Sequence, residues 1–575
     1  MEKKGLGNHL TPKVQWSLTD EGMGVLERAG LAGLYLSLTA AEEWATRGDP
    51  QAQELQSIIS WELSDQSVQL RWEGEDLPAL TKLLEWAWQV KNGVFYLPAV
   101  HRSQDEREHL YKRLDTHRGL FQTFFQHPKV LPREKLIAEI IQEDENHFFQ
   151  VTYQKIKDRR GGLPQVKILS EILKKGMSRE ATSLSASWIC PGAAKRFGKA
   201  AKEEENWGGP PKLGILLLFA PLACVFLELP RTKVKTRGGG QFKPNWAFLV
   251  PEIQSLMTFG DYFPLFRYQT PADFLRVRVQ SLGDAALLFA SAYAARSMER
   301  RLRLQKVYIT AMGQVSHYQG QKVRKKILEL TPSEISIKRY ERMMGHLPNE
   351  FRTRQVNKVE DSTQIQANLW IRQPTARGRI ADNLVHGRPW YQDLLWPHPW
   401  QLDILESHRQ RIKQRENESI SLEHLWFNNL LFERRALMDL AEETGMWDSP
   451  EEQALLTIFH QTLRQLLNKE EEAQKRGGSR NLGERWDDRV QAVRRGLMRA
   501  KTRELNRKFL MEFLAEGGGS KELTEKKEAL WRFLNHPYDW QKARDLALLA
   551  LVTFIDKRLG KPKEIAETEE AGSDE

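Results

Sequence analysis

Cysteine is scarce in this chain: only Cys190 and Cys224 occur in 575 residues. Two thiols are too few for a disulfide framework or a thiolate metal site, and such low usage is typical of a reducing compartment. The N-terminal residues lack the apolar segment of a secretion signal. The longest uncharged apolar run, 213–227, has fifteen residues and contains Pro221. It is too short for a membrane span, so we expect a cytoplasmic protein without a membrane partner.

Motifs for the common nucleotide and metal chemistries are also missing. The sequence has no G-x-x-x-x-G-K-[ST] loop, and its triplet Gly238–Gly240 is followed by Gln241 and Phe242, so ATP hydrolysis is not expected. It has no H-E-x-x-H or C-x-x-C, which removes the usual ligands of metal-dependent hydrolysis. We therefore predict no cofactor, no metal ligand and no catalytic residue. A nucleic-acid-binding protein that is not an enzyme fits these absences best.

Positive charge is what the chain has in excess. Its formal net charge is +10 and its sequence pI is near 9.3, which favours a polyanionic partner. A hydrophobic share of 40% and a charged share of 28% indicate folded cores, and the length allows two to four domains. The 18 tryptophans could serve in cores or stack on bases, and by default we assign them to cores.

The stretch around residues 213–253 predicts a central hairpin. Two apolar runs, 213–229 and 246–253, are rich in β-branched and aromatic residues and predict buried strands. The loop between them has five cations and no acid, and its glycines let the backbone approach a ligand closely. A solvated loop and a contact with nucleic-acid phosphates or a groove both remain open. The candidate binding residues of this loop are Lys233, Lys235, Arg237, Gly238, Gly239, Gly240, Gln241 and Lys243.

The residues before this hairpin predict a mixture of helices and strands. Residues 25–46 predict a buried helix in which Gly30 and Gly33 allow close packing. Residues 61–73 predict a β-hairpin with its turn at 64–66. Four nearby histidines lack the spacing of a helical zinc site, so we interpret them as surface or hydrogen-bonded residues. These are His101, His109, His117 and His127.

A second basic region follows the hairpin. Residues 296–326 contain nine lysines or arginines against one acid. A nucleic-acid contact and a solvated face are comparable interpretations. The candidate binding residues here are Arg300, Arg301, Arg303, Lys322, Arg324 and Lys325. The polar stretch 346–382 has little periodicity and predicts a loop.

From about residue 401 the pattern is helical, with breaks near Asn417 and at 448–450, 476–478, 517–519 and 535–537. One helix is predicted over 486–516, and four arginines recur along it at every fourth residue: Arg495, Arg499, Arg503 and Arg507. Four residues rise about 6 Å, close to the phosphate spacing of an extended strand. A solvated amphipathic face and a groove that follows a nucleic-acid backbone both remain open. We call these four residues the arginine row.

The predicted fold class is therefore α+β. Residues 1–400 form a mixed α/β body around a buried β-hairpin core, and residues 401–562 form an all-α helical bundle. Residues 563–575 are predicted to be an acidic disordered tail, because the last twelve residues contain six acids and no base.

Several stretches, taken in order, resemble one family. They are RAGLAGLYL (28–36), GVFYLPAVHR (93–102), TFFQHPK (123–129), NWAFLVPEI (245–253), VYITAMGQVSHYQGQKV (307–323), NLVHGRPWY (383–391) and LMRAKTREL (497–505). The chain resembles the large subunit of type I CRISPR Cascade complexes, in the Myxan or I-B branch. Each stretch is weakly specific alone, and their order carries the resemblance.

The resemblance implies a non-catalytic subunit of an RNA-guided surveillance complex in the prokaryotic cytoplasm. Such a subunit recognises the protospacer-adjacent motif on double-stranded DNA, helps start R-loop formation and stabilises the displaced strand. Base pairing with the guide CRISPR RNA supplies sequence specificity. The implied partners are that RNA, the target DNA, the backbone and handle-binding Cascade subunits, and a nuclease-helicase or transposition-targeting proteins. Antiviral defence and guide-directed transposition both remain open.

Local chemistry suggests how the residues divide this work. The basic glycine-rich loop suits insertion into a DNA groove, with Gln241 or Phe242 as a wedge between base pairs. The arginine row suits the displaced strand. The helical bundle resembles the Cascade small subunit, and an internal start at Met438 or Met446 would release it as a separate protein.

Two other functions are alternatives to this interpretation. The first is a metal-independent endoribonuclease that processes guide RNA, for which His101, His127 or His317 would have to act as acid or base. The second is a membrane-surface protein that uses the apolar run 213–227.

Overall fold

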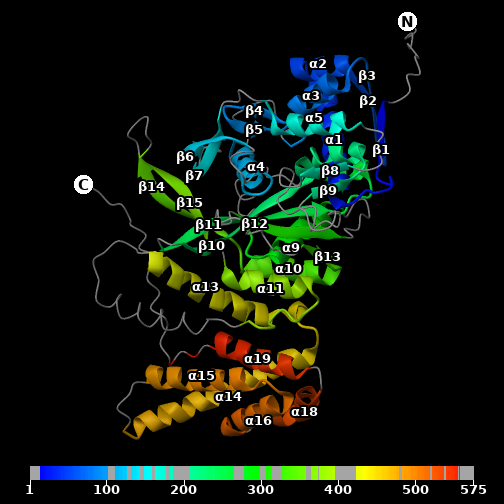
Figure 1. Ribbon diagram of the computed structural model, residues 1–575. Coiled ribbons are helices and arrows are strands. Elements are labelled where there is room, and N and C mark those ends of the chain that lie inside the picture. Colours follow the sequence, from blue (N-terminus) through cyan, green and yellow to red (C-terminus); the bar gives the residue numbers. More distant parts are fainter. Residues whose placement is uncertain are drawn as a thin grey trace. The chain divides into compact units, whose positions relative to one another are not determined.

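The chain forms two units in a computed structural model (Figure 1). One comprises Met1–Ile337 and Asn349–Gln373, and the other Lys338–Pro348 and Pro374–Glu575. The residues described are 13–100, 110–125, 131–142, 148–157, 162–176, 182–185, 206–236, 239–263, 278–297, 306–313, 327–357, 364–372, 374–394, 422–477, 482–518, 521–536, 539–554, 556 and 558. In segments 231–236, 239–244, 350–357, 364–372 and 422–431 only the backbone is described. The predicted boundary near residue 400 and the predicted tail lie outside the described residues.

The first unit combines helices with small sheets, as the α+β fold class predicts. Its helices are α1 (Val25–Thr46), α2 (Pro50–Ile58), α3 (Asp76–Ala87), α4 (Leu110–Gln122), α5 (Pro164–Lys174), α7 (Pro211–Leu216), η2 (Ala220–Ala223), α8 (Leu256–Tyr262) and α9 (Leu282–Ser297). Helix α10 (Glu334–His346) begins in this unit and continues in the second.

The described strands of the first unit form five sheets. They are β1 (Val14–Ser17), β2 (Ile59–Leu63), β3 (Ser67–Trp72), β4 (Gln89–Lys91), β5 (Val94–Tyr96), β6 (Arg133–Gln142), β7 (Phe148–Ile156), β8 (Thr182–Ser185), β9 (Asn206–Gly209), β10 (Val225–Thr236), β11 (Gly239–Pro251), β12 (Val307–Gly313), β13 (Leu328–Leu330), β14 (Glu350–Asn357) and β15 (Gln364–Arg372). The sheet orders are β1-β3-β2, β10-β11-β12-β13, β14-β15-β7-β6, β4-β5 and β8-β9. The hairpin predicted at 61–73 is confirmed as β2 and β3, paired from Ile59↔Trp72 to Leu63↔Val68.

Helix α1 organises the core of the first unit. Its first turn is closed by a capping interaction, in which the Gly24 amide donates to Glu27 Oε2 at 3.1 Å. A Cβ on Gly30 would overlap the carbonyl oxygen of Leu216, and one on Gly33 would overlap that of Phe219. The predicted close packing at both glycines is therefore confirmed, and the chain that passes over them is the segment 211–223.

The same segment corrects the prediction that 213–229 is one strand. Only the part from Val225 onward is β10, because the residues before it form α7 and η2. Pro211 starts the first of these helical turns and Pro221 lies in the second, and proline's fixed φ suits both positions. Leu213, Leu216 and Leu222 are completely buried, so the run is a core segment. No helix among the described residues is long and apolar enough to cross a bilayer.

The loop predicted for 346–382 is also wrong. Strands β14 and β15 form an antiparallel hairpin there, and α11 (Thr375–Val385) follows in the second unit. β15 pairs in parallel with β7 at Asn368↔Phe149, so the hairpin extends a sheet begun two hundred residues earlier. Local composition does not reveal such pairing, because strand formation depends strongly on neighbouring strands.

The second unit is helical throughout its described part, as the bundle prediction requires. Its helices are α11, α13 (Leu422–Glu442), η5 (Thr444–Met446), α14 (Pro450–Lys475), α15 (Leu482–Arg499), α16 (Arg503–Glu516), α17 (Lys521–Glu525), α18 (Lys527–Asn535) and α19 (Trp540–Thr553). Helix α14 contacts α15, α16, α18 and α19, and their apolar faces form the core of this unit. The predicted breaks at 448–450, 476–478, 517–519 and 535–537 separate these helices.

The single helix predicted over 486–516 is wrong, because α15 ends at Arg499 and α16 begins at Arg503. Thr502 caps the second helix, with its hydroxyl accepting from the Leu505 amide at 3.3 Å. Across the break, Gly496 lies so close to the Phe509 ring that a Cβ would overlap it. The break therefore lets α15 and α16 pack against each other.

Candidate nucleic-acid interface

The hairpin of β10 and β11 has a buried root. Val225 to Leu229 pair with Leu249 to Asn245, and β12 continues the sheet on the other side of β11. Phe226, Trp246 and Phe248 are at most 8% exposed. A strand that is paired on both edges and buried on its faces is held rigidly, so the root is a firm base for the rest of the hairpin.

The outer half of the hairpin begins at an irregularity between Leu229 and Thr232. Pairing then resumes at Thr232↔Lys243 and ends at Thr236↔Gly239. The predicted extended finger on a buried hairpin is thus present in the backbone. Lys233 and Lys235 occupy alternate positions of β10 and so share one face of the ribbon. Arg237 and Gly238 lie outside the described residues.

Four charged side chains join the hairpin root to α4 and to the segment before α9. We call this group the root clasp: Asp115, Arg118, Glu228 and Arg278. Arg118 lies 2.8 Å from Asp115 and 3.0 Å from Glu228. Arg278 lies 3.3 Å from Asp115 and 3.0 Å from Glu228. Each cation therefore contacts both acids, and the four side chains are at most 18% exposed.

The root clasp joins the root of the hairpin to the elements that pack around it. The Arg118 guanidinium lies over the Trp246 ring, 5.5 Å from its centroid, which ties α4 to β11 as well as to β10. The Val279 amide donates to the Glu228 carbonyl at 3.1 Å, and Asn349 Nδ2 donates to the Arg278 carbonyl at 2.8 Å. Removal of any one partner would leave the opposite charge unpaired and poorly solvated, which is energetically costly. The four side chains therefore stabilise one another's positions.

The arginine row lies on the second unit, on two helices. Arg495 and Arg499 belong to α15, whereas Arg503 and Arg507 belong to α16. The four residues therefore do not lie along one continuous helix. All four side chains are exposed. Arg503 Nε lies 3.3 Å from Glu504, and Arg507 Nη1 donates to Asn535 Oδ1 at 2.9 Å. The row thus remains on the surface, and Arg507 has an orienting contact with α18.

Several predicted candidates lie outside the described residues. The second basic region contributes six of them: Arg300, Arg301, Arg303, Lys322, Arg324 and Lys325. The histidines considered for a nuclease, His101, His127 and His317, and the cysteine Cys190 also lie outside. For the loop residues Lys233, Lys235, Gly239, Gly240, Gln241 and Lys243 the structure gives the backbone position.

His117 has a structural role in α4. Its Nδ1 accepts from the Phe95 amide at 3.3 Å, and its Nε2 lies 2.8 Å from the Gln154 carbonyl. Burial lowers the pKa of His117 to about 4. A neutral ring with its proton on Nε2 satisfies both neighbours, so the interpretation of this histidine as a hydrogen-bonded residue is confirmed.

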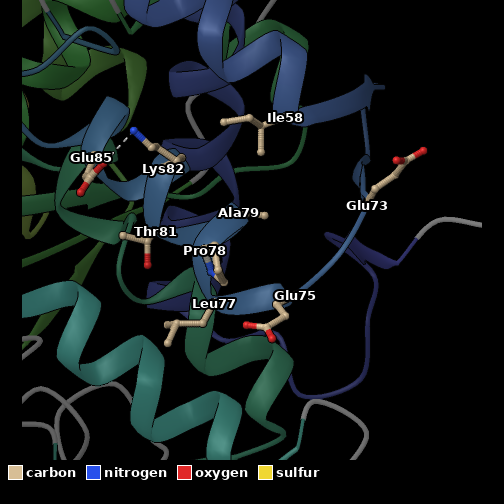
Figure 2. Close-up of a pocket in the computed structure, with 9 residues that line it drawn as sticks. All are labelled: Ile58, Glu73, Glu75, Leu77, Pro78, Ala79, Thr81, Lys82 and Glu85. Atoms are coloured by element: carbon tan, nitrogen blue, oxygen red, sulfur yellow. Dashed lines mark ion pairs between the residues drawn. The ribbon is translucent and has the colours of Figure 1, made fainter.

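The described residues contain no group of three or more His, Cys, Asp or Glu side chains arranged to hold a metal ion. They do include an open cavity of about 460 Å³ between α2 and α3 (Figure 2), which is lined by Ile58, Glu73, Glu75, Leu77, Pro78, Ala79, Thr81, Lys82 and Glu85. Lys82 pairs with Glu85 at 3.8 Å and with Glu54 at 3.0 Å. The remaining acids repel phosphate, so we exclude this cavity from the interface.

The root clasp is the part of the site that sequence reasoning missed. One signal was present, because Glu228 interrupts an otherwise apolar strand in VFLELP. A buried acid in such a run requires a cationic partner. The partners, at positions 118 and 278, are too far away in the sequence to be identified from it.

The family model for the DevT N-terminal domain matches residues 15–218, and that for the DevT C-terminal domain matches residues 442–575. A CRISPR-associated protein Cas8a1/Csx13 from Myxococcus xanthus (strain DK1622) is 27% identical over 567 residues, which covers 96% of this chain and 89% of the relative. These matches confirm the resemblance to Cascade large subunits. The chain therefore belongs to the DevT family of Cas8-type CRISPR-associated proteins.

Proposed function

We propose that this Cascade large subunit recognises the protospacer-adjacent motif on double-stranded DNA, helps start R-loop formation and stabilises the displaced strand. The observation that carries the proposal is the β10–β11 hairpin. Its root is buried and clasped, while its outer half carries Lys233, Lys235 and Lys243 beyond an irregularity in the pairing.

A two-stranded ribbon is narrow enough to enter a DNA groove. The glycines at 238–240 permit close approach to the sugar-phosphate backbone, and the cations neutralise phosphates on either side. Gln241 and Phe242 are our candidates for the wedge that separates the first base pairs. A rigid root matters for this role. If the ribbon moved freely in the unbound protein, ordering it on the DNA would cost conformational entropy and lower the binding affinity.

The other cationic surfaces receive the remaining strands. We assign the displaced single strand to the arginine row, whose side chains are exposed on α15 and α16. We include Arg300, Arg301, Arg303, Lys322, Arg324 and Lys325 among the nucleic-acid contacts because of their dense charge. The proposed partners are the guide CRISPR RNA, the target DNA, and the backbone and handle-binding subunits. A nuclease-helicase would serve defence, and transposition-targeting proteins would serve guide-directed transposition.

The test uses the complex assembled with its guide RNA. Replacement of Lys235, Arg237, Gln241 and Lys243 by alanine should weaken binding to a duplex that carries the motif, while guide-RNA assembly survives. A matched control removes three lysines from other exposed surfaces of the first unit, Lys82, Lys157 and Lys174. This control should bind the duplex as the wild type does. Equal loss of guide assembly and duplex binding would show that the hairpin is structural.

We further propose that the subunit acts by binding and leaves covalent bonds unchanged. Purified protein incubated with labelled guide-precursor RNA or single-stranded DNA, with and without magnesium, should bind each strand and leave it intact. Cleavage that is abolished by replacement of His101, His127 or His317 would support the endoribonuclease instead.

A separate small subunit could also arise from an internal start. Met438 lies within α13, whereas Met446 follows α13 and precedes α14, so a start at Met446 would preserve all helices from α14 onward. Met446 is also completely buried in the full chain. Immunoblotting of a C-terminal tag should show a short second product that disappears in Met446→Leu. A single full-length band from the wild-type gene would contradict this proposal.

A further inference from the structure

Trp531 differs from the other tryptophans whose side chains the structure describes. Ten of those are buried and two are partly exposed, whereas Trp531 is 55% exposed. The default assignment of tryptophans to cores therefore fails at this position. A single exposed apolar side chain is common on protein surfaces, so the case for a ligand depends on the residues around Trp531.

The position of Trp531 links it to the arginine row. Helix α18 buries Leu530 and Leu534 and turns Trp531 outward. Asn535 lies four residues further along the helix, a rise of about 6 Å. Its Nδ2 donates to the Trp531 carbonyl at 2.7 Å, and its Oδ1 accepts from Arg507 Nη1 at 2.9 Å. Asn535 therefore joins the guanidinium of Arg507 to the turn of α18 that begins at Trp531.

The surface around this pair is basic. Lys526, Lys527 and Arg532 are exposed on or beside α18, and Lys508 is exposed next to Arg507. Residues 494–536 contain eleven lysines or arginines against six acids, a net charge of +5. Cations next to an exposed aromatic ring are the combination that binds single-stranded nucleic acid, since the ring stacks on a base and the cations neutralise phosphates.

We propose that Trp531 is a stacking platform for a base of single-stranded DNA, and that Arg507 binds a neighbouring phosphate. The inference rests on the proposed assignment of the displaced strand to the arginine row, and it adds a contact with the bases. Asn535 is the positioning residue that orients Arg507 on the side of α18.

The test separates bases from phosphates. Full-length protein is titrated with an oligothymidylate and with an abasic oligonucleotide of the same length and charge. Trp531→Ala should weaken oligothymidylate binding about five- to hundred-fold, and Trp531→Phe should retain most of the affinity. Neither change should affect binding of the abasic strand, the salt dependence or the melting temperature. Trp61→Ala, at a partly exposed tryptophan on β2, is the matched control and should bind as the wild type does.

The remaining outcomes each decide the matter. Unchanged oligothymidylate affinity of Trp531→Ala would overturn the stacking platform. If alanine substitution of the arginine row still lowered the salt dependence of DNA binding in that case, the assignment of the displaced strand to the arginine row would remain supported. Equal loss on both oligonucleotides would show that Trp531 only supports Arg507. Loss of co-purifying Cascade subunits without loss of DNA affinity would assign Trp531 to a protein contact, and a preference for oligouridylate would assign it to RNA.

Discussion

Single buried residues of the first unit set limits on its stability. The His117 ring has a hydrogen-bonding neighbour at each nitrogen, and its neutral form suits both. Protonation would place an N–H on Nδ1 against the Phe95 amide, so two donors would face each other. The lowered pKa of His117, about 4, therefore reflects burial and a site built for the neutral ring.

This arrangement predicts a pH dependence of unfolding. The folded-state pKa of about 4 lies below the ordinary value of 6.5, so the stabilising contribution is present above pH 6.5 and is lost as the pH falls toward 4. Its full size is about 3 kcal/mol. His117→Gln, which cannot titrate, should show a smaller loss of stability between pH 7 and pH 4 in chemical unfolding. His386→Gln, at an exposed histidine, should retain the wild-type dependence. Parallel curves for wild type and His117→Gln would contradict the prediction.

The glycines of α1 restrict which side chains the core can accommodate. A methyl group at Gly30 would overlap the Leu216 carbonyl oxygen, which belongs to a buried backbone and cannot move freely. Gly30→Ala should therefore lower the free energy of unfolding by about 1–3 kcal/mol. Gly345→Ala in α10 provides the control, because no atom lies within 4 Å of its added Cβ. It should be neutral or stabilise by up to about 1 kcal/mol. A mild effect of Gly30→Ala would show that α7 can move away from α1.

Among the structural elements, the β10–β11 hairpin is stabilised at its root by the root clasp. Glu228→Gln keeps the shape of the side chain and removes one of the two acids, so Arg118 and Arg278 then share only Asp115. We expect a loss of about 2–4 kcal/mol, somewhat below a fully buried pair because the clasp is partly exposed. Glu62→Gln breaks the 2.6 Å pair with Arg71 on β2 and β3, where the acid is 57% exposed, and should cost less than about 1 kcal/mol. Equal effects in denaturant titrations would argue against the clasp.

The clasp also predicts a functional effect that stability alone does not explain. Glu228→Gln should weaken duplex binding by the assembled complex at temperatures well below unfolding, because the hairpin is then less rigidly oriented. Unfolding measurements and duplex titrations on the same preparation separate the two effects. Wild-type duplex affinity in the folded variant would restrict the clasp to stability.

The elements predicted from the sequence were those with strong local signals. Helix α1 has an apolar face and a capping Glu27, and the hairpin of β2 and β3 has a polar turn, so both are set by neighbouring residues. Strands β14 and β15 depend on β7, and the segment 211–223 depends on the glycines of α1, so neither could be predicted locally. The break at Thr502 did have a local signal, a capping threonine before Glu504, which the regular arginine spacing obscured.

The candidate site also combines residues that the sequence reveals with residues that only the fold brings together. The cations of the hairpin and the arginine row could be identified from the sequence because charge density is a local property. The root clasp joins positions 115, 118, 228 and 278, and only the fold brings them together. The role proposed for Trp531 likewise depends on its exposure, which its position in a helical pattern did not reveal.

In the molecule as a whole, the proposed contacts lie on both units. We propose that the hairpin of the first unit binds duplex DNA and that the arginine row of the second unit binds a single strand. Because each phosphate contact contributes a counterion to the salt dependence of binding, the two surfaces can be measured independently. Different ligands should therefore respond to different substitutions.

The most direct test measures the salt dependence of binding for the assembled complex on a motif-bearing duplex and on single-stranded DNA. Alanine at Lys235, Arg237 and Lys243 should reduce the slope by up to about three on the duplex and leave the single strand unchanged. Alanine at Arg495, Arg499, Arg503 and Arg507 should reduce the slope by up to about three on the single strand and leave the isolated duplex contact unchanged. Identical slopes for wild type and both variants on both ligands would contradict the account.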